Sequence, residues 1–86
     1  MYKVVLLPKA KKTFAEAGAP LARKLARVLK LLETHPLRHP NVKPLVGPLR
    51  GFFRFRTGDY RIVYQIDTSK EIVYVVRIAN RREVYD

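Results

Sequence analysis

Apolar and cationic residues alternate along residues 51–64, which read GFFRFRTGDYRIVY. Such alternation is typical of half-buried β-strands, so the segment predicts two strands joined by a tight turn. Directly opposed residues of an antiparallel pair point to the same side of the sheet. The predicted hairpin therefore sorts its side chains into two faces: an apolar face with Phe53, Phe55, Tyr60, Ile62 and Tyr64, and a cationic face with Arg54, Arg56 and Arg61.

The length of the turn decides which arginines lie opposite each other. A two-residue loop at positions 57 and 58 would place Arg54 opposite Arg61, and Arg56 opposite Asp59. A three-residue loop would move Arg61 to the apolar face, so the pattern favours the shorter loop. Like charges in direct opposition are normally destabilising. A fold that keeps two opposed arginines is therefore expected to hold an anion between them.

Helical spacing is confined to the first part of the chain. An apolar, β-branched run from Tyr2 to Leu7 predicts a buried strand, which Pro8 ends. A short helix is expected over residues 9–17, and a stronger one opens at Pro20 and ends before Pro36. Its apolar residues fall at i, i+4, i+7, i+8 and i+11, which makes a single stripe of Leu21, Leu25, Val28, Leu29 and Leu32.

Strand-like segments fill most of the second half. Residues 36–48 hold four prolines, which predicts an extended connector within one domain. Strands are then expected over residues 51–56, 59–67 and 71–78, with a turn at 67–70 and a candidate fourth strand at 81–85. Residues 71–78 are apolar on both sides, so the register of the last hairpin and the face of Arg77 stay open.

This order of elements predicts an α+β fold. It has an N-terminal strand, a two-helix hairpin, and then a three- to four-stranded, mainly antiparallel sheet with the helices on one face. The chain has 86 residues. That length leaves no room for a second core, so a single domain spanning residues 1–86 is expected.

The charge balance narrows the class of partner. Eighteen Lys and Arg against seven Asp and Glu give a net charge of +11. Such a surplus indicates a polyanionic partner, which is nucleic acid, an anionic membrane or an acidic protein. No stretch approaches the roughly 18 apolar residues of a membrane span, and the N-terminal residues do not read as a signal peptide. A soluble, cytoplasmic protein is the simplest expectation.

The residue types that bind metals are scarce. The absence of cysteine excludes disulfides and thiolate zinc sites. The two histidines, His35 and His39, flank prolines in the connector, and carboxylates are few. We therefore expect neither a metal nor another cofactor.

Two blocks of sequence resemble the RelE/ParE superfamily of toxins from bacterial and archaeal toxin–antitoxin modules. They are VKPLVGPLRGFFRFRTGDYRIVYQI at residues 42–66 and IVYVVRIANRREVY at residues 72–85, and the similarity carries on upstream through the helices. The resemblance implies a RelE-like fold. For the RelE branch it also implies metal-independent cleavage of mRNA in the ribosomal A site. The implied partners are mRNA, the ribosome and a cognate acidic antitoxin, which joins the otherwise monomeric toxin in a hetero-oligomer. The antitoxin would neutralise the toxin by covering its arginines or by blocking its entry to the ribosome.

The resemblance also assigns roles to residues of this chain. It implies a catalytic set of Arg54, Arg61, Arg81 and Tyr85. The guanidinium groups would bind the phosphate and stabilise its transition state, and Tyr85 would take up a proton or stack on a base. Arg82 competes with Arg81 for the same position, and Phe52 stands where some relatives have lysine. Expected RNA-binding residues are Arg56, Arg82, Lys43, Arg50 and Phe52.

Two other functions are compatible with the sequence. A ParE-like toxin of the same fold would inhibit DNA gyrase by binding, without cutting RNA. A basic module without catalytic activity would bind only RNA or an acidic protein. The joint presence of Arg61, Arg81 and Tyr85 favours the nuclease, because a pure binder has no need for that set.

Overall fold

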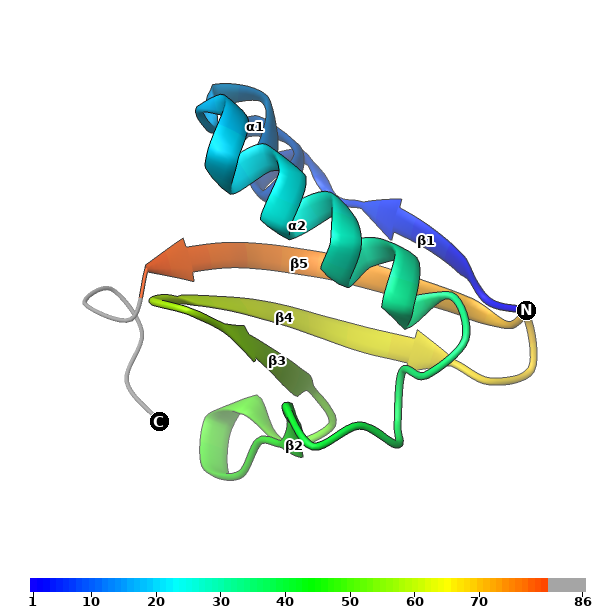
Figure 1. Ribbon diagram of the computed structural model, residues 1–86. Helices are drawn as coiled ribbons and strands as arrows, with labels where there is room; N and C mark the ends of the chain where they lie inside the picture. The colour runs from blue at the N-terminus through cyan, green and yellow to red at the C-terminus, as the bar shows by residue number, and fades with distance from the viewer. Residues whose placement is uncertain (81–86) are drawn as a thin grey trace.

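Two helices lie on one face of a five-stranded sheet (Figure 1). The computed structural model describes residues 1–80, so the strand expected at 81–85 lies outside the described residues. The elements in chain order are β1 (Lys3–Leu6), α1 (Pro8–Glu16), α2 (Ala19–Leu32), β2 (Val42–Pro44), a 3-10 turn η1 (Gly47–Leu49), β3 (Phe53–Thr57), β4 (Tyr60–Asp67) and β5 (Ile72–Asn80). The predicted α+β class is confirmed. α1 lies within one residue of its predicted bounds, and α2 begins one residue before Pro20 and ends at Leu32, ahead of the stop predicted at residues 34–36.

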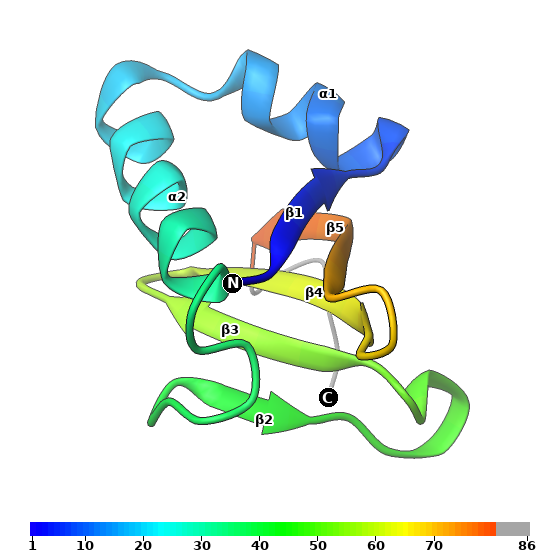
Figure 2. The ribbon, with the colours of Figure 1, turned by 90° about the vertical axis from the view of Figure 1, so that its right-hand side faces the viewer.

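The sheet is mixed, with strand order β1-β5-β4-β3-β2. β1 pairs with β5 in parallel, and every other pair is antiparallel. Helices α1 and α2 together form the connection between β1 and the rest of the sheet (Figure 2). No helix among residues 1–80 is long and apolar enough to cross a membrane.

The connector predicted at residues 36–48 contains a strand that the sequence pattern does not predict. β2 has only three residues and pairs with β3 at the edge of the sheet, where Val42 lies opposite Phe55 and Pro44 opposite Phe53. Proline is tolerated in an edge strand because its missing N–H can face away from the ladder. Pro44 argues against a central strand, but it is compatible with the edge strand β2.

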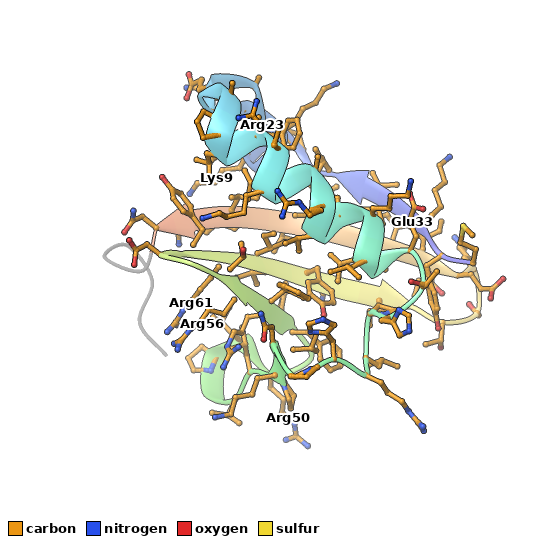
Figure 3. The ribbon with its side chains drawn as sticks, in the orientation of Figure 1. Lys9, Arg23, Glu33, Arg50, Arg56 and Arg61 are labelled. Carbon is orange, nitrogen blue, oxygen red and sulfur yellow. The ribbon has the colours of Figure 1, made fainter. Side chains whose placement is uncertain are left out.

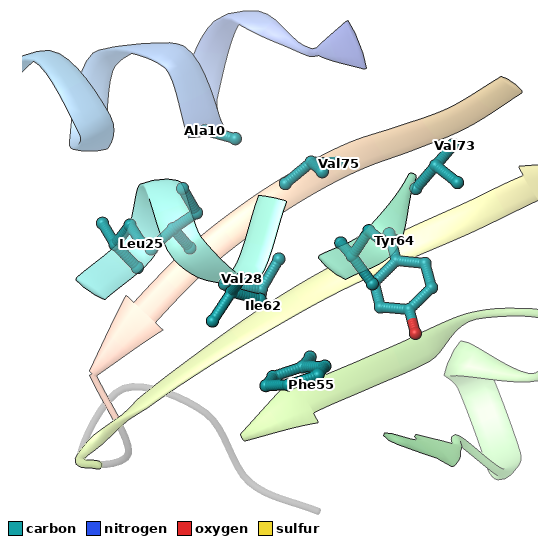
Figure 4. Close-up of a cluster of buried hydrophobic side chains, with 10 residues drawn as sticks. Ala10, Leu25, Val28, Phe55, Ile62, Tyr64, Val73 and Val75 are labelled. Atoms are coloured by element: carbon teal, nitrogen blue, oxygen red, sulfur yellow. The ribbon is translucent and has the colours of Figure 1, made fainter. Parts of the chain in front are cut away.

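The core lies between the helices and the sheet. The apolar stripe of α2 buries Leu25, Val28 and Leu32. They pack with Ala10 of α1 onto the sheet residues Phe55, Ile62, Tyr64, Val73, Val75 and Ile78 (Figure 4). Burial of each large apolar side chain stabilises the fold by about 1.5–3 kcal/mol. The stripe and the predicted apolar face of the hairpin thus meet in one cluster.

Tyr64 joins the end of the helical layer to the sheet. Its side chain is fully buried, and its hydroxyl Oη donates a 2.7 Å hydrogen bond to the carbonyl O of Pro36. Burial raises the pKa of the Tyr64 phenol well above its usual range, so it stays a neutral donor. Pro36 follows the last turn of α2 and is itself buried. The bond therefore fixes the path of the chain as it leaves α2.

Replacing Tyr64→Phe is expected to lower the free energy of unfolding by about 1–3 kcal/mol, because the buried Pro36 carbonyl would lose its partner. Urea unfolding measures the change. Tyr60→Phe is the matched control. Tyr60 is half-buried, and no hydrogen bond of its hydroxyl is found in residues 1–80. In Tyr60→Phe, the free energy of unfolding is expected to fall by less than about 0.5 kcal/mol. Equal effects of the two changes would contradict the role given to this hydrogen bond.

Candidate functional site

The turn between β3 and β4 has the predicted length but not the predicted position. Thr57 pairs with Tyr60, so Gly58 and Asp59 form the two-residue loop. Gly58 has φ of 57° at the first loop position, as in type II′ turns. A β-branched threonine would be strained at a positive φ, so Thr57 stays in the strand.

The opposed arginine pair differs from the prediction as a result. Arg56 lies opposite Arg61, and Arg54 lies opposite Val63. The predicted opposition of Arg54 to Arg61 and of Arg56 to Asp59 was therefore wrong. The shift moves each partner by two residues, which preserves the side on which every residue points. The division into an apolar and a cationic face is confirmed.

Within residues 1–80, five cations of strands β2 to β5 share the face of the sheet that is turned away from the helices, which we call the cationic face: Lys43, Arg54, Arg56, Arg61 and Arg77. One row across the sheet runs from Lys43 through Arg54 and Val63 to Arg77. The next row holds Arg56, Arg61 and Ala79. Neighbouring strands are about 4.8 Å apart, so each row can contact successive groups of one polyanion.

Arg77, whose face the sequence leaves open, is placed there by a β-bulge. Val63 pairs with Arg77 but the next residue, Tyr64, pairs with Val75, which leaves Val76 as an extra residue in β5. The bulge interrupts the two-residue alternation of β5. The buried positions of β5 reflect this, because Val75 and Ile78 of the core are three residues apart.

A small network holds Arg54 in position. Its Nη1 donates a 2.8 Å hydrogen bond to the carbonyl O of Asn41. Asn41 in turn donates through Nδ2 to the carbonyl O of Arg56 at 2.9 Å. Partial burial and the nearby Arg56 lower the pKa of the Arg54 guanidinium. It remains a cation at neutral pH, because arginine titrates so far above 7.

Arg61 is the most enclosed cation of the face. Its side chain is 7% exposed, whereas Arg56 opposite it is exposed to solvent. Figure 3 shows the two side chains next to each other on the side away from the helices. A charge with little water around it interacts more strongly with a bound anion than an exposed charge does. The pair therefore combines an enclosed, largely dehydrated guanidinium with an accessible one.

The other predicted site residues are distributed unevenly. Lys43 lies opposite Arg54 on the cationic face. Arg50 follows η1 and points away from the Arg56 and Arg61 pair (Figure 3). Phe52 is half-buried just before β3, and its carbonyl O accepts a 2.9 Å bond from the N–H of Leu45, which extends the ladder between β2 and β3. The predictions for Arg81, Arg82 and Tyr85 lie outside the described residues.

An apolar pocket of about 430 Å³ adjoins the cationic face at the β2 edge. Its lining combines Lys43 and Arg54 with the apolar residues Leu45, Val46 and Leu49. Within residues 1–80, no group of three or more His, Cys, Asp or Glu side chains could hold a metal ion. The cationic face therefore carries charges of the sign that binds anions, and the apolar pocket lies beside it.

Comparison with known proteins identifies the family. A family model described as the ParE toxin of the type II toxin–antitoxin system parDE matches residues 4–85. The chain belongs to this toxin family. Toxin RelG of Mycobacterium tuberculosis is 39% identical over 54 residues, which cover 63% of this chain and 60% of the relative. Toxin RelE of the same organism is 44% identical over 43 residues, or 50% of this chain and 44% of the relative. The toxin thus aligns with about half the length of these relatives.

Solved structures confirm the RelE-like fold of this ParE-family toxin. The toxin–antitoxin complex RelBE2 from Mycobacterium tuberculosis superposes with a TM-score of 0.83 at 28% identity, covering 93% of this chain and 98% of the other. An archaeal RelE–RelB complex from Pyrococcus horikoshii gives 0.80 at 22% identity, covering 96% and 98%. At 22% identity, the similarity to the archaeal complex is a similarity of fold alone.

Binding of a single-stranded polyanion is expected to fall steeply with salt. Each phosphate contact on a single strand contributes about 0.7 to the slope of log affinity against log salt. Arg77→Ala should therefore make the slope for an oligouridylate shallower by about 0.7. Fluorescence anisotropy over a salt series measures it. Arg23→Ala, on the exposed side of α2, should leave the slope unchanged. A slope that responds to Arg23 and not to Arg77 would place the binding surface elsewhere.

Proposed function

We propose that this toxin binds mRNA in the ribosomal A site and cleaves it without a metal ion, through attack by the neighbouring 2′-hydroxyl of the RNA. The observation that carries the proposal is the direct opposition of Arg56 and Arg61 across β3 and β4, with Lys43 opposite Arg54 one row along. Opposed cations of this kind favour a bound phosphate between them. RNA supplies the 2′-hydroxyl that DNA lacks.

The reaction needs negative charge to be stabilised on the phosphate. The 2′-oxygen forms a bond to phosphorus, the bond to the 5′-oxygen breaks, and the non-bridging oxygens carry added charge in between. Guanidinium groups match these oxygens in geometry and stay charged throughout. Arg61 is enclosed by the protein and largely shielded from water. A donor held in this way contributes about 10²–10³-fold to the rate.

Proton transfer is assigned on sequence grounds. The 2′-hydroxyl must lose a proton, and the 5′-oxygen must gain one. Arginine is a poor general base because its pKa lies above about 12. Tyr85 is the candidate for proton transfer or for stacking on a base, and Arg81 or Arg82 is the candidate for a further phosphate contact. A site with weak bases depends on substrate alignment, and the ribosome would provide that alignment.

An acidic antitoxin is the proposed protein partner. The net charge of +11 and the cationic face call for a segment of opposite charge. The RelBE2 structure that resembles this toxin is itself a toxin–antitoxin complex, and the archaeal RelE of similar fold is in complex with RelB. A toxin that acts on ribosomes would work in the cytoplasm.

Gyrase inhibition is the second candidate function. It is favoured by the family model itself, whose description names the ParE toxin of the parDE system. An inhibitor of this kind would use the cationic face, or another surface, for binding alone. It would have no need for an enclosed guanidinium such as that of Arg61.

Arg61→Ala is expected to reduce mRNA cleavage on programmed ribosomes by about 10²–10³-fold. Primer extension on a defined mRNA measures the rate and the position of the cut. Because Arg61 is buried, Arg56→Ala serves as a second variant at an exposed position, with a loss of at least tenfold expected. Arg23→Ala is the control and should cleave like the parent protein.

Three outcomes are distinguishable in the same preparations. Fragments that end in the A site and depend on Arg56 and Arg61 support the nuclease. Loss of gyrase supercoiling with intact mRNA would overturn it in favour of the second candidate. No effect on mRNA, gyrase or cell growth would leave only a basic binding module.

A further inference from the structure

A second pocket of about 420 Å³ opens on the sheet at the end opposite the Gly58 turn. It lies where β4 and β5 run into their connecting turn. Its lining includes Gly51, Gln65, Asp67, Thr68, Ser69 and Tyr74. None of these residues belongs to the catalytic or RNA-binding set assigned from the sequence, so the pocket needs its own explanation.

The pocket lies beside the cationic face. Gln65 pairs with Tyr74, and Gln65 follows Val63 by two residues in β4, so both point to the same side. Val63 is the direct neighbour of Arg54 and of Arg77. One strand step of two residues covers about 7 Å. The pocket is therefore one row beyond the row that contains Arg54 and Arg77.

Its polar groups are set in place by the turn. Asp67 Oδ1 accepts a 2.7 Å hydrogen bond from Ser69 Oγ and a 3.0 Å bond from the backbone N–H of Lys70. These bonds, that from Ser69 first, lower the pKa of the Asp67 carboxyl, so it is ionised at neutral pH. Gln65 is exposed and offers an amide donor and acceptor, and half-buried Tyr74 offers an aromatic ring.

Charge determines which part of a nucleotide fits here. The Asp67 carboxylate repels phosphate, whereas the adjacent rows attract it. A carboxylate and an amide hydrogen-bond to the edges of bases, and a carboxylate accepts from amino groups such as N4 of cytosine. Tyrosine rings stack on the faces of unpaired bases. Phosphates would therefore lie along the cations while one base turns into the pocket.

We propose that the pocket formed by Gln65, Asp67 and Tyr74 is a nucleobase subsite, which takes a base with an exocyclic amino group from a strand held on the cationic face. The ring of the base stacks on Tyr74, and its amino group donates to Asp67. The choice of RNA as the ligand rests on the proposed function. The subsite itself concerns binding and needs no cleavage.

Binding of fluorescein-labelled hexamers of adenylate, cytidylate and uridylate to the full chain at low salt tests the subsite. Adenylate and cytidylate are expected to bind about tenfold more tightly than uridylate, which lacks the amino group. Tyr74→Ala should weaken adenylate binding by about tenfold, whereas Tyr74→Phe keeps the ring and should bind like the parent. Circular dichroism checks that each variant is folded.

A second pair of variants isolates the carboxylate. Asp67→Asn keeps an oxygen for the hydrogen bonds from Ser69 and Lys70, but it should remove most of the preference for adenylate over uridylate. Glu16→Gln removes an exposed carboxylate of α1 and should leave the preference unchanged. Equal binding of the three hexamers, or unchanged binding in Tyr74→Ala, overturns the proposal.

The subsite and the nuclease can fail separately. A protein that cuts mRNA on ribosomes but binds the three hexamers equally refutes the subsite alone. A protein that leaves mRNA intact but keeps a preference dependent on Tyr74 and Asp67 refutes the nuclease and supports the subsite.

Discussion

The pairing of β3 with β4 determines where most of the sheet cations lie. Its apolar side packs against α2 through Phe55 and Ile62, so the opposite side must carry Arg54, Arg56 and Arg61. The packing of one face thus enforces the crowding of like charges on the other. Opposed cations cost stability, and a domain this small has little in reserve. The core under α2 therefore offsets the repulsion on which the proposed site depends.

The packing of one side of the sheet against the helices also explains why the cationic face and the pocket at Tyr74 differ in chemistry. Near the Gly58 turn the free face is cationic, and near the turn at residues 68–71 it offers an aromatic ring, an amide and a carboxylate. The core face changes little along the same strands, because Ile62 and Tyr64 pack against Ile78, Val75 and Val73. Chemistry can therefore vary along one side of the sheet without disturbing the other.

Much of this arrangement follows from the sequence, and the exceptions have physical causes. The faces of the hairpin were predictable because a two-residue shift in register preserves them. The partner of Arg61 was not, since it depends on which residue takes the positive φ at the turn. The face of Arg77 required knowledge of the bulge at Val76, which leaves no clear pattern in an apolar strand. β2 was missed because Pro44 lies within it. The pocket at Tyr74 combines residues whose types are ordinary and whose proximity depends on the unpredicted register.

The parallel pairing of β1 with β5 has a consequence for biosynthesis. β5 lies between β1 and β4, although it is the last strand along the described chain. Val4 and Leu6 find their neighbours Val73 and Val75 only after the chain has been made as far as β5. Contacts between such distant segments form late and slow the folding reaction. A nascent chain of this topology cannot complete its sheet while β5 is still inside the ribosome, so Arg77 joins the other cations of the face only after β5 has emerged.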